Sequence, residues 1–154
     1  MSISVSSPVT GAAQTGFTSP TYTVVQDQDP APNGKQWVVT ALGGTQAGVV
    51  ISSASNPFFV SLFRPLTFKP VGVPDASGIL RTRNVNTWKF HVWKGVTPYS
   101  GQAPQVMKIR GEIDVPAGAD TADAANIRAA LALMIGTLNQ VSASLGDSVI
   151  NGTL

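Results

Sequence analysis

The sequence predicts an α+β fold: an N-terminal β-hairpin, an antiparallel β-sheet of about five strands, and two C-terminal helices. Two segments, 88–93 and 105–115, alternate between apolar and polar side chains, and this period of two is typical of strands with one apolar face. The connections between the predicted strands are too short for parallel crossovers. An Ala- and Leu-rich segment with helical spacing follows the strands, an order that is typical of α+β chains.

The first part of the chain predicts an arm and a hairpin. Residues 1–20 are rich in Ser, Thr, Gly and Ala and predict an arm or a short edge strand. Thr21–Gln26 and Gln36–Leu42 contain β-branched and aromatic residues on either side of a turn at Asp27–Gly34. These two segments therefore predict the paired strands of the hairpin.

The next part predicts shorter strands and a long loop. Gln46–Ser52 predicts a short strand, and Phe58–Arg64 is apolar on both faces. Such a segment indicates a buried strand, or a strand whose outward face meets a subunit or a ligand. Pro65 then indicates an edge or a bend. Residues 66–69 can continue the strand, and 70–80 predicts a loop because it contains two Pro, two Gly and an Asp.

The central strand, Asn84–Lys94, has one apolar face and one face with basic and aromatic side chains. Its apolar face carries Trp88, Phe90 and Val92, and its other face carries Lys89, His91 and Trp93. The strand Gln105–Val115 repeats this arrangement after the loop Gly95–Pro104. Its apolar face carries Met107, Ile109, Ile113 and Val115, and its charged face carries Lys108, Arg110, Glu112 and Asp114. Together the two strands predict a sheet with one face for a core and one face for a charged partner.

The C-terminal segment predicts two helices that can cover the apolar face. Asp120 and Thr121 form an N-cap signal, and Asp123 lies in the first turn, where the helix dipole favours an acid. The first helix is predicted over 121–138 and a weaker one over 144–150. We therefore expect a single domain, 1–154, with the hairpin and sheet in 21–115 and the helices in 120–150.

The composition predicts that the chain is not a monomer. Charged residues make up 12% of the sequence and hydrophobic residues 43%, whereas globular domains carry about 25% charged residues. The apolar face of the sheet and the apolar side of the first helix together form a larger surface than one copy of the chain can bury. A symmetric homodimer solves this problem; the alternative is a monomer with an uncharged polar surface.

The basic residues are concentrated in the middle of the chain. Eight of the ten lie in the segment from Arg64 to Arg110, so one face of the sheet is expected to be basic. Such a face is suited to a polyanion. An ordinary solvated β surface is the alternative interpretation of the same charges.

The sequence lacks the residues that several classes of function require. There is no Cys and only one His, the acids are scattered, and no phosphate-binding loop is present. The Asp27–Asp29 turn lacks the further ligands of a calcium loop. We therefore expect no enzyme, no cofactor and no metal site. The N-terminus predicts no signal peptide, and no apolar run predicts a membrane span.

The order of these segments resembles the coat proteins of single-stranded RNA bacteriophages of the levivirus type. The resemblance covers about 21–150 and is best from Arg81 onward. It is carried by the N-terminal hairpin, the Arg83–Val92 strand, the strand that ends at Ile113–Val115, and the Ile127–Leu131 helix with a short second helix after it.

The resemblance implies a structural protein of the virion capsid that assembles in the cytoplasm of a bacterial host. Such coat proteins form interlocked dimers, in which two sheets join and the helices cross the partner, and the dimers build a small icosahedral shell. The helices face outward and the sheet faces the genomic RNA. In several relatives a dimer also binds an RNA hairpin at the replicase start and represses translation. The loop at Gly95–Pro104 would make contacts around the symmetry axes.

The resemblance also implies RNA-facing residues on alternating positions of three strands. They match Lys89 and His91, Lys108 and Arg110, and Phe59 and Ser61, with the last pair uncertain by one residue. Some relatives have Tyr where this chain has Lys108, so aromatic stacking is not expected there. Trp93 shares the face and can stack a base or pack in an interface; Arg83 can touch phosphate or solvent. Two other functions are a cellular single-stranded nucleic-acid-binding module and a self-assembling phage tail or pilus subunit.

Overall fold

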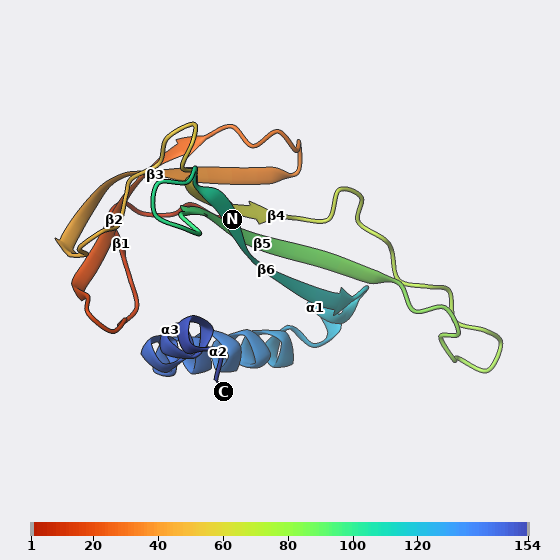
Figure 1. The fold of residues 1–154 in the computed structure, drawn as a ribbon. Helices are drawn as coiled ribbons and strands as arrows, with labels where there is room; N and C mark the ends of the chain where they lie inside the picture. Colours follow the sequence, from red (N-terminus) through yellow and green to blue (C-terminus); the bar gives the residue numbers. More distant parts are fainter. Residues whose placement is uncertain (1, 154) are drawn as a thin grey trace.

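The computed structural model describes residues 2–153, so Met1, at the start of the predicted arm, lies outside the described residues. Its six strands form one antiparallel sheet in the order β1-β2-β3-β4-β5-β6, and the helices follow the last strand (Figure 1). The strands are β1 Val9–Thr10, β2 Thr18–Asp27, β3 Gly34–Thr45, β4 Phe58–Phe63, β5 Val85–Val96 and β6 Gln105–Pro116. The helices are α1 Ala119–Ala122, α2 Ala124–Gln140 and α3 Ser142–Asn151.

The predicted α+β fold is confirmed, with one strand more than expected. The additional strand is the short edge strand β1, which lies within residues 1–20, where the sequence predicted an arm or a short edge strand, and it pairs with β2 through Val9 and Tyr22. The strand predicted at 46–52 is wrong. That segment is a loop, because Gly48 has a positive φ of 81° and the Gln46 amide donates to the main-chain oxygens of Thr21 and Gly43. The predicted continuation at 66–69 is also absent.

The helices begin and end at other residues than the sequence predicts. Asp123 is not in the first turn of a long helix: its φ of −146° ends α1, and α2 begins at the next residue. Its carboxylate accepts hydrogen bonds from the side-chain amide of Asn126 at 2.8 and 2.9 Å. A bend of 63° at Val141 then separates α2 from α3. No single described helix is long and apolar enough to cross a membrane; α2 and α3 taken together pass that test by length and composition only.

The buried core is small and lies on the apolar face of β2 and β3. Val24, Trp37 and Val39 are buried, and the N-terminal residues Val5 and Val9 pack against them. The arm is attached to this face, because the Lys35 ammonium donates to the Ser2 hydroxyl at 2.6 Å and to the main-chain oxygen of Ile3. The N-terminal segment therefore covers one half of the apolar face.

The other half of the apolar face, on β5 and β6, is open in the single chain. On β6, Ile109 is 49% exposed and Met107 is also exposed. No residue of α2 is buried, and Leu133 is 72% exposed. Figure 1 shows that α2 lies apart from the sheet and that α1 joins it to the end of β6. Two apolar surfaces, one on the sheet and one on the helices, are thus left without a partner.

The C-terminal helix returns to the N-terminal part of the chain. The side-chain amide of Gln14 donates to the main-chain oxygen of Ser142 at 2.9 Å, and the Ser142 hydroxyl donates to the main-chain oxygen of Ala13 at 2.8 Å. Thr15 donates to the carboxylate of Asp147 at 2.8 Å. We call these contacts the clasp. They close the chain into a ring that consists of the sheet, the helices and the β1–β2 loop.

Candidate nucleic-acid interface

The charged face of β5 and β6 is built by the cross-strand register. Lys89 lies opposite Glu112, His91 opposite Arg110, and Trp93 opposite Lys108. Side chains of directly opposite residues share a face of the sheet. The structure therefore brings together the residues of these two strands that the resemblance assigned to the RNA-facing surface.

The charge on this face is unevenly distributed along the strands. The Lys89 ammonium forms an exposed ion pair with the Glu112 carboxylate at 2.8 Å, and Thr87 donates to the Asp114 carboxylate at 2.5 Å. Within residues 2–153, neither Lys108 nor Arg110 has a carboxylate within ion-pair distance. The positive potential is consequently concentrated near the ends of β5 and β6 that adjoin the Gly95–Pro104 loop.

Trp93 packs against other side chains of this face. Its ring lies 5.2 Å from the Phe59 ring, and the Lys108 ammonium lies 4.8 Å from its centroid. This cation–π contact holds the Lys108 charge above one face of the indole. A base that stacked on that face would have to displace Lys108. The indole nitrogen is buried and has no hydrogen-bond partner among the described residues.

The register of β4, which the sequence left uncertain, places Ser61 opposite His91. Ser61 therefore belongs to the charged face, but it is only 2% exposed, and its hydroxyl donates to Oε1 of Gln36 at 3.2 Å. Gln36 lies directly opposite it on β3. A contact between Ser61 and RNA would require the neighbouring side chains of this face to move. Sequence reasoning missed Gln36, because its place beside Ser61 depends on the pairing of β3 with β4.

His91 lies between the aromatic and the basic parts of the face. Its ring centroid is 5.0 Å from that of Phe63 on β4, and Arg110 lies opposite it on β6. The imidazole packs against the Phe63 ring, and its nitrogen atoms can donate or accept a hydrogen bond.

Arg83 is not brought to this face. It is exposed and precedes β5, in the long loop between β4 and β5. Lys94, another of the central basic residues, lies on the opposite, apolar face. Its ammonium donates to Asn56 at 2.8 Å and lies 5.1 Å from the Phe58 ring centroid, and burial lowers the pKa of Lys94 below its ordinary value. Lys94 therefore positions the β3–β4 loop.

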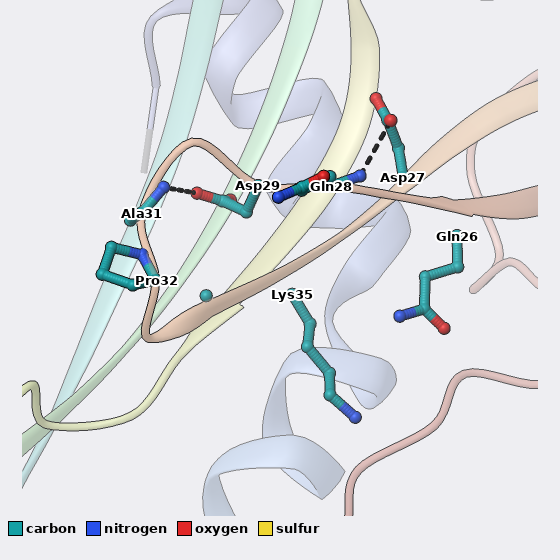
Figure 2. Close-up of a pocket in the computed structure, with 8 residues that line it drawn as sticks. Gln26, Asp27, Gln28, Asp29, Ala31, Pro32 and Lys35 are labelled. Carbon is teal, nitrogen blue, oxygen red and sulfur yellow. Dashed lines mark hydrogen bonds between the residues drawn. The ribbon is translucent and has the colours of Figure 1, made fainter.

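The predicted turn between β2 and β3 is confirmed, and it borders a shallow hollow of about 540 Å³ (Figure 2). Both carboxylates are used by the turn: Asp27 accepts from the Gln28 N–H and Asp29 from the Ala31 N–H, each at 2.8 Å. Within residues 2–153, no group of three or more His, Asp or Glu residues could hold a metal ion.

The fold is found in a solved phage particle. The virus-like particle of bacteriophage ESE020 contains a chain that is 56% identical and superposes with a TM-score of 0.97, over 99% of this chain and 100% of that chain. The chain belongs to the levivirus-type coat proteins. The virus-like particle of Wenzhou levi-like virus 4 is more distant, with 16% identity and a TM-score of 0.44 over 84% of this chain and 74% of that chain. No protein-family model and no curated protein sequence matches this coat protein.

Proposed function

We propose that this coat protein assembles, through a homodimer, into a closed icosahedral shell that encloses single-stranded RNA. The observation that carries the proposal is the full-length similarity, at 56% identity, to a chain that forms a virus-like particle. A shell requires a subunit with large complementary apolar surfaces, and the chain has two: the β5–β6 half of the sheet and the exposed side of α2.

The dimer is the first step, because each chain leaves an edge strand and a helix without partners. The outer edge of β6 pairs with no strand among the described residues, so its main-chain groups can hydrogen-bond to a second β6. Helix α2 of each copy would then lie on the open apolar face of the other. Obligate interfaces of this kind bury roughly 2,000–5,000 Å² in total.

RNA is the partner proposed for the charged face. Lys108 and Arg110 are exposed cations without a carboxylate partner among residues 2–153, and phosphate binding by such residues is largely independent of sequence. His91 and Gln36 add hydrogen-bonding groups beside them. Lys89 contributes less, because Glu112 already neutralises it. An RNA hairpin at the replicase start would bind the same face if the dimer also represses translation.

The test is to express the chain alone in bacteria, separate the products by size, and examine them by electron microscopy with the absorbance ratio at about 260 and 280 nm. Closed uniform particles that contain host RNA are the expected result. Dimers that bind RNA without forming particles would indicate a nucleic-acid-binding module. Particles without RNA would support a self-assembling subunit of another kind.

A further inference from the structure

Trp93 lies in a row of apolar side chains that crosses the charged face of the sheet. Val38 on β3 lies opposite Phe59 on β4, and Phe59 lies opposite Trp93 on β5. Trp93 in turn lies opposite Lys108 on β6. Directly opposite residues share a face, and the three apolar side chains are half-buried, whereas Lys108 is exposed. The row therefore ends in a cation on the outer strand of the sheet.

The indole of Trp93 is supported by the next side chain of this row. The centroids of the Trp93 and Phe59 rings are 5.2 Å apart, and the two ring planes are tilted by 33°. Aromatic pairs at this separation attract each other beyond the effect of the area that they bury. The indole N–H is buried and has no hydrogen-bond partner among the described residues. Trp93 is thus a supported ring whose polar group does not reach the surface of the sheet.

The ammonium of Lys108 rests on the ring of Trp93, 4.8 Å from its centroid. The face of an indole is negative and attracts a cation at this distance. A free lysine side chain loses rotamer freedom when it binds a ligand, and its contact with the ring removes part of that loss beforehand. The ammonium has several N–H donors, and only one side of it faces the ring. The donors on its other side are available to an anion.

A second cation lies beside Lys108 on the same face. Arg110 is exposed and lies two residues further along β6, a distance of about 6.6 Å in an extended strand. Neither cation has a carboxylate within ion-pair distance among residues 2–153. A phosphate can bind the Lys108 ammonium where it already lies, whereas a base can reach the indole face only by displacing that ammonium. The arrangement therefore favours the RNA backbone over a base as the group that binds beside Trp93.

We propose that Trp93 is a positioning residue, which holds the Lys108 ammonium in place for a backbone phosphate of single-stranded RNA and does not itself stack a base. The proposal rests on the proposed function, because it requires RNA on the charged face. The sequence allows Trp93 to stack a base or to pack in an interface, and the cation above its ring gives it a third role. Because every nucleotide carries the same phosphate, binding at this end of the face would not depend on the RNA sequence.

The first experiment is a double-mutant cycle on RNA affinity. The wild type, Trp93→Leu, Lys108→Ala and the combined variant are compared as dimers, released from particles where these form, for their binding of a fluorescently labelled oligouridylate. Trp93→Leu should weaken binding about two- to fivefold, the loss expected for an exposed cation–π contact. The same substitution should have no effect when residue 108 is already Ala. An equal loss in both backgrounds, or no loss in either, would overturn the proposal.

Two further variants separate positioning from damage to the fold. Trp93→Phe keeps a ring face beneath the Lys108 ammonium and should retain more of the affinity than Trp93→Leu does. Phe68→Leu removes a ring that is 51% exposed in the β4–β5 loop, away from the charged face, and should bind oligouridylate as the wild type does. A Trp93→Phe variant that binds no better than Trp93→Leu would contradict a role for the ring face.

The second experiment needs no variant and follows the Lys108 side chain directly. The ring current of the indole should shift the NMR signal of the Lys108 Cε methylene upfield in the free dimer, and this shift should persist when oligouridylate is bound. Loss of the shift on binding would show that a base has displaced Lys108, and it would overturn the proposal. Wild-type dimers that bind no oligouridylate would instead contradict the proposed function, so the two failures are distinguishable.

Discussion

Gln14 and Ser142 are joined by a 2.9 Å hydrogen bond across 128 residues of sequence, from the β1–β2 loop to the start of α3. Ser142 returns a second bond to the main chain of Ala13, and it is one of the few buried polar residues. Helix α2 has no buried residue. The clasp, rather than packing of α2 against its own sheet, therefore holds the helices in place within the single chain.

The first prediction concerns the clasp. Gln14→Ala should lower the free energy of unfolding of the dimer by about 1 kcal/mol, since a part-buried hydrogen bond contributes about that amount. Urea unfolding followed by circular dichroism measures it. Gln102→Ala, at an exposed position in the β5–β6 loop, is the control and should change stability little. Equal stability of the two variants would show that the clasp does not contribute.

A second prediction concerns a close approach across the sheet. The Phe90 ring lies over Gly111 on β6, where a Cβ atom would overlap it. Gly111→Ala should therefore destabilise the protein by about 1–3 kcal/mol, as overpacking does. A Cβ atom at Gly136 in α2 meets nothing within 4 Å, so Gly136→Ala should be neutral or stabilising. Thermal unfolding of both variants tests the difference; a neutral Gly111→Ala would contradict the packing.

The third prediction concerns RNA. Lys108→Ala with Arg110→Ala should reduce RNA binding and lower the slope of log K against log salt by about 1 for each phosphate that the variant no longer neutralises. Lys89→Ala with Arg110→Ala should also weaken binding and leave dimers intact, but less, because Lys89 already pairs with Glu112. Arg128→Ala, on α2, is the control for removal of a positive charge away from the sheet. An unchanged RNA content in both double variants would exclude the sheet face as the binding surface.

The fourth prediction concerns Lys94. Burial lowers its pKa in the folded protein below the ordinary 10.5, so between the folded and the unfolded pKa the unfolded chain binds more protons. Stability contributed by this group therefore rises with pH in that alkaline window. The wild type should gain stability relative to Lys94→Met as the pH rises toward the unfolded-state pKa of 10.5, as measured by urea unfolding. A constant difference would contradict the burial effect.

Much of the fold could be predicted because it depends on local patterns. Alternation located β5 and β6, and the register confirmed which of their side chains share a face. Other features depend on contacts distant in sequence. The choice between an arm and a short edge strand at residues 1–20 depends on the pairing of β1 with β2, and the hydrogen bond from Ser61 to Gln36 depends on the pairing of β3 with β4. The loop between β4 and β5 is held by the side chains of Asn84 and Asn86, which form no periodic signal.

The order of charges along β6 also carries information about orientation. The charged face of β6 carries two basic residues, Lys108 and Arg110, followed by two acidic residues, Glu112 and Asp114. Gly111 is the midpoint of these four positions along the strand. Two such edges laid antiparallel about Gly111 would set Lys108 beside Asp114 and Arg110 beside Glu112. A parallel alignment would set like charges together, at a cost. Two copies of β6 related by a two-fold rotation therefore place opposite charges beside each other. The same four residues disfavour the parallel alignment of the two edges.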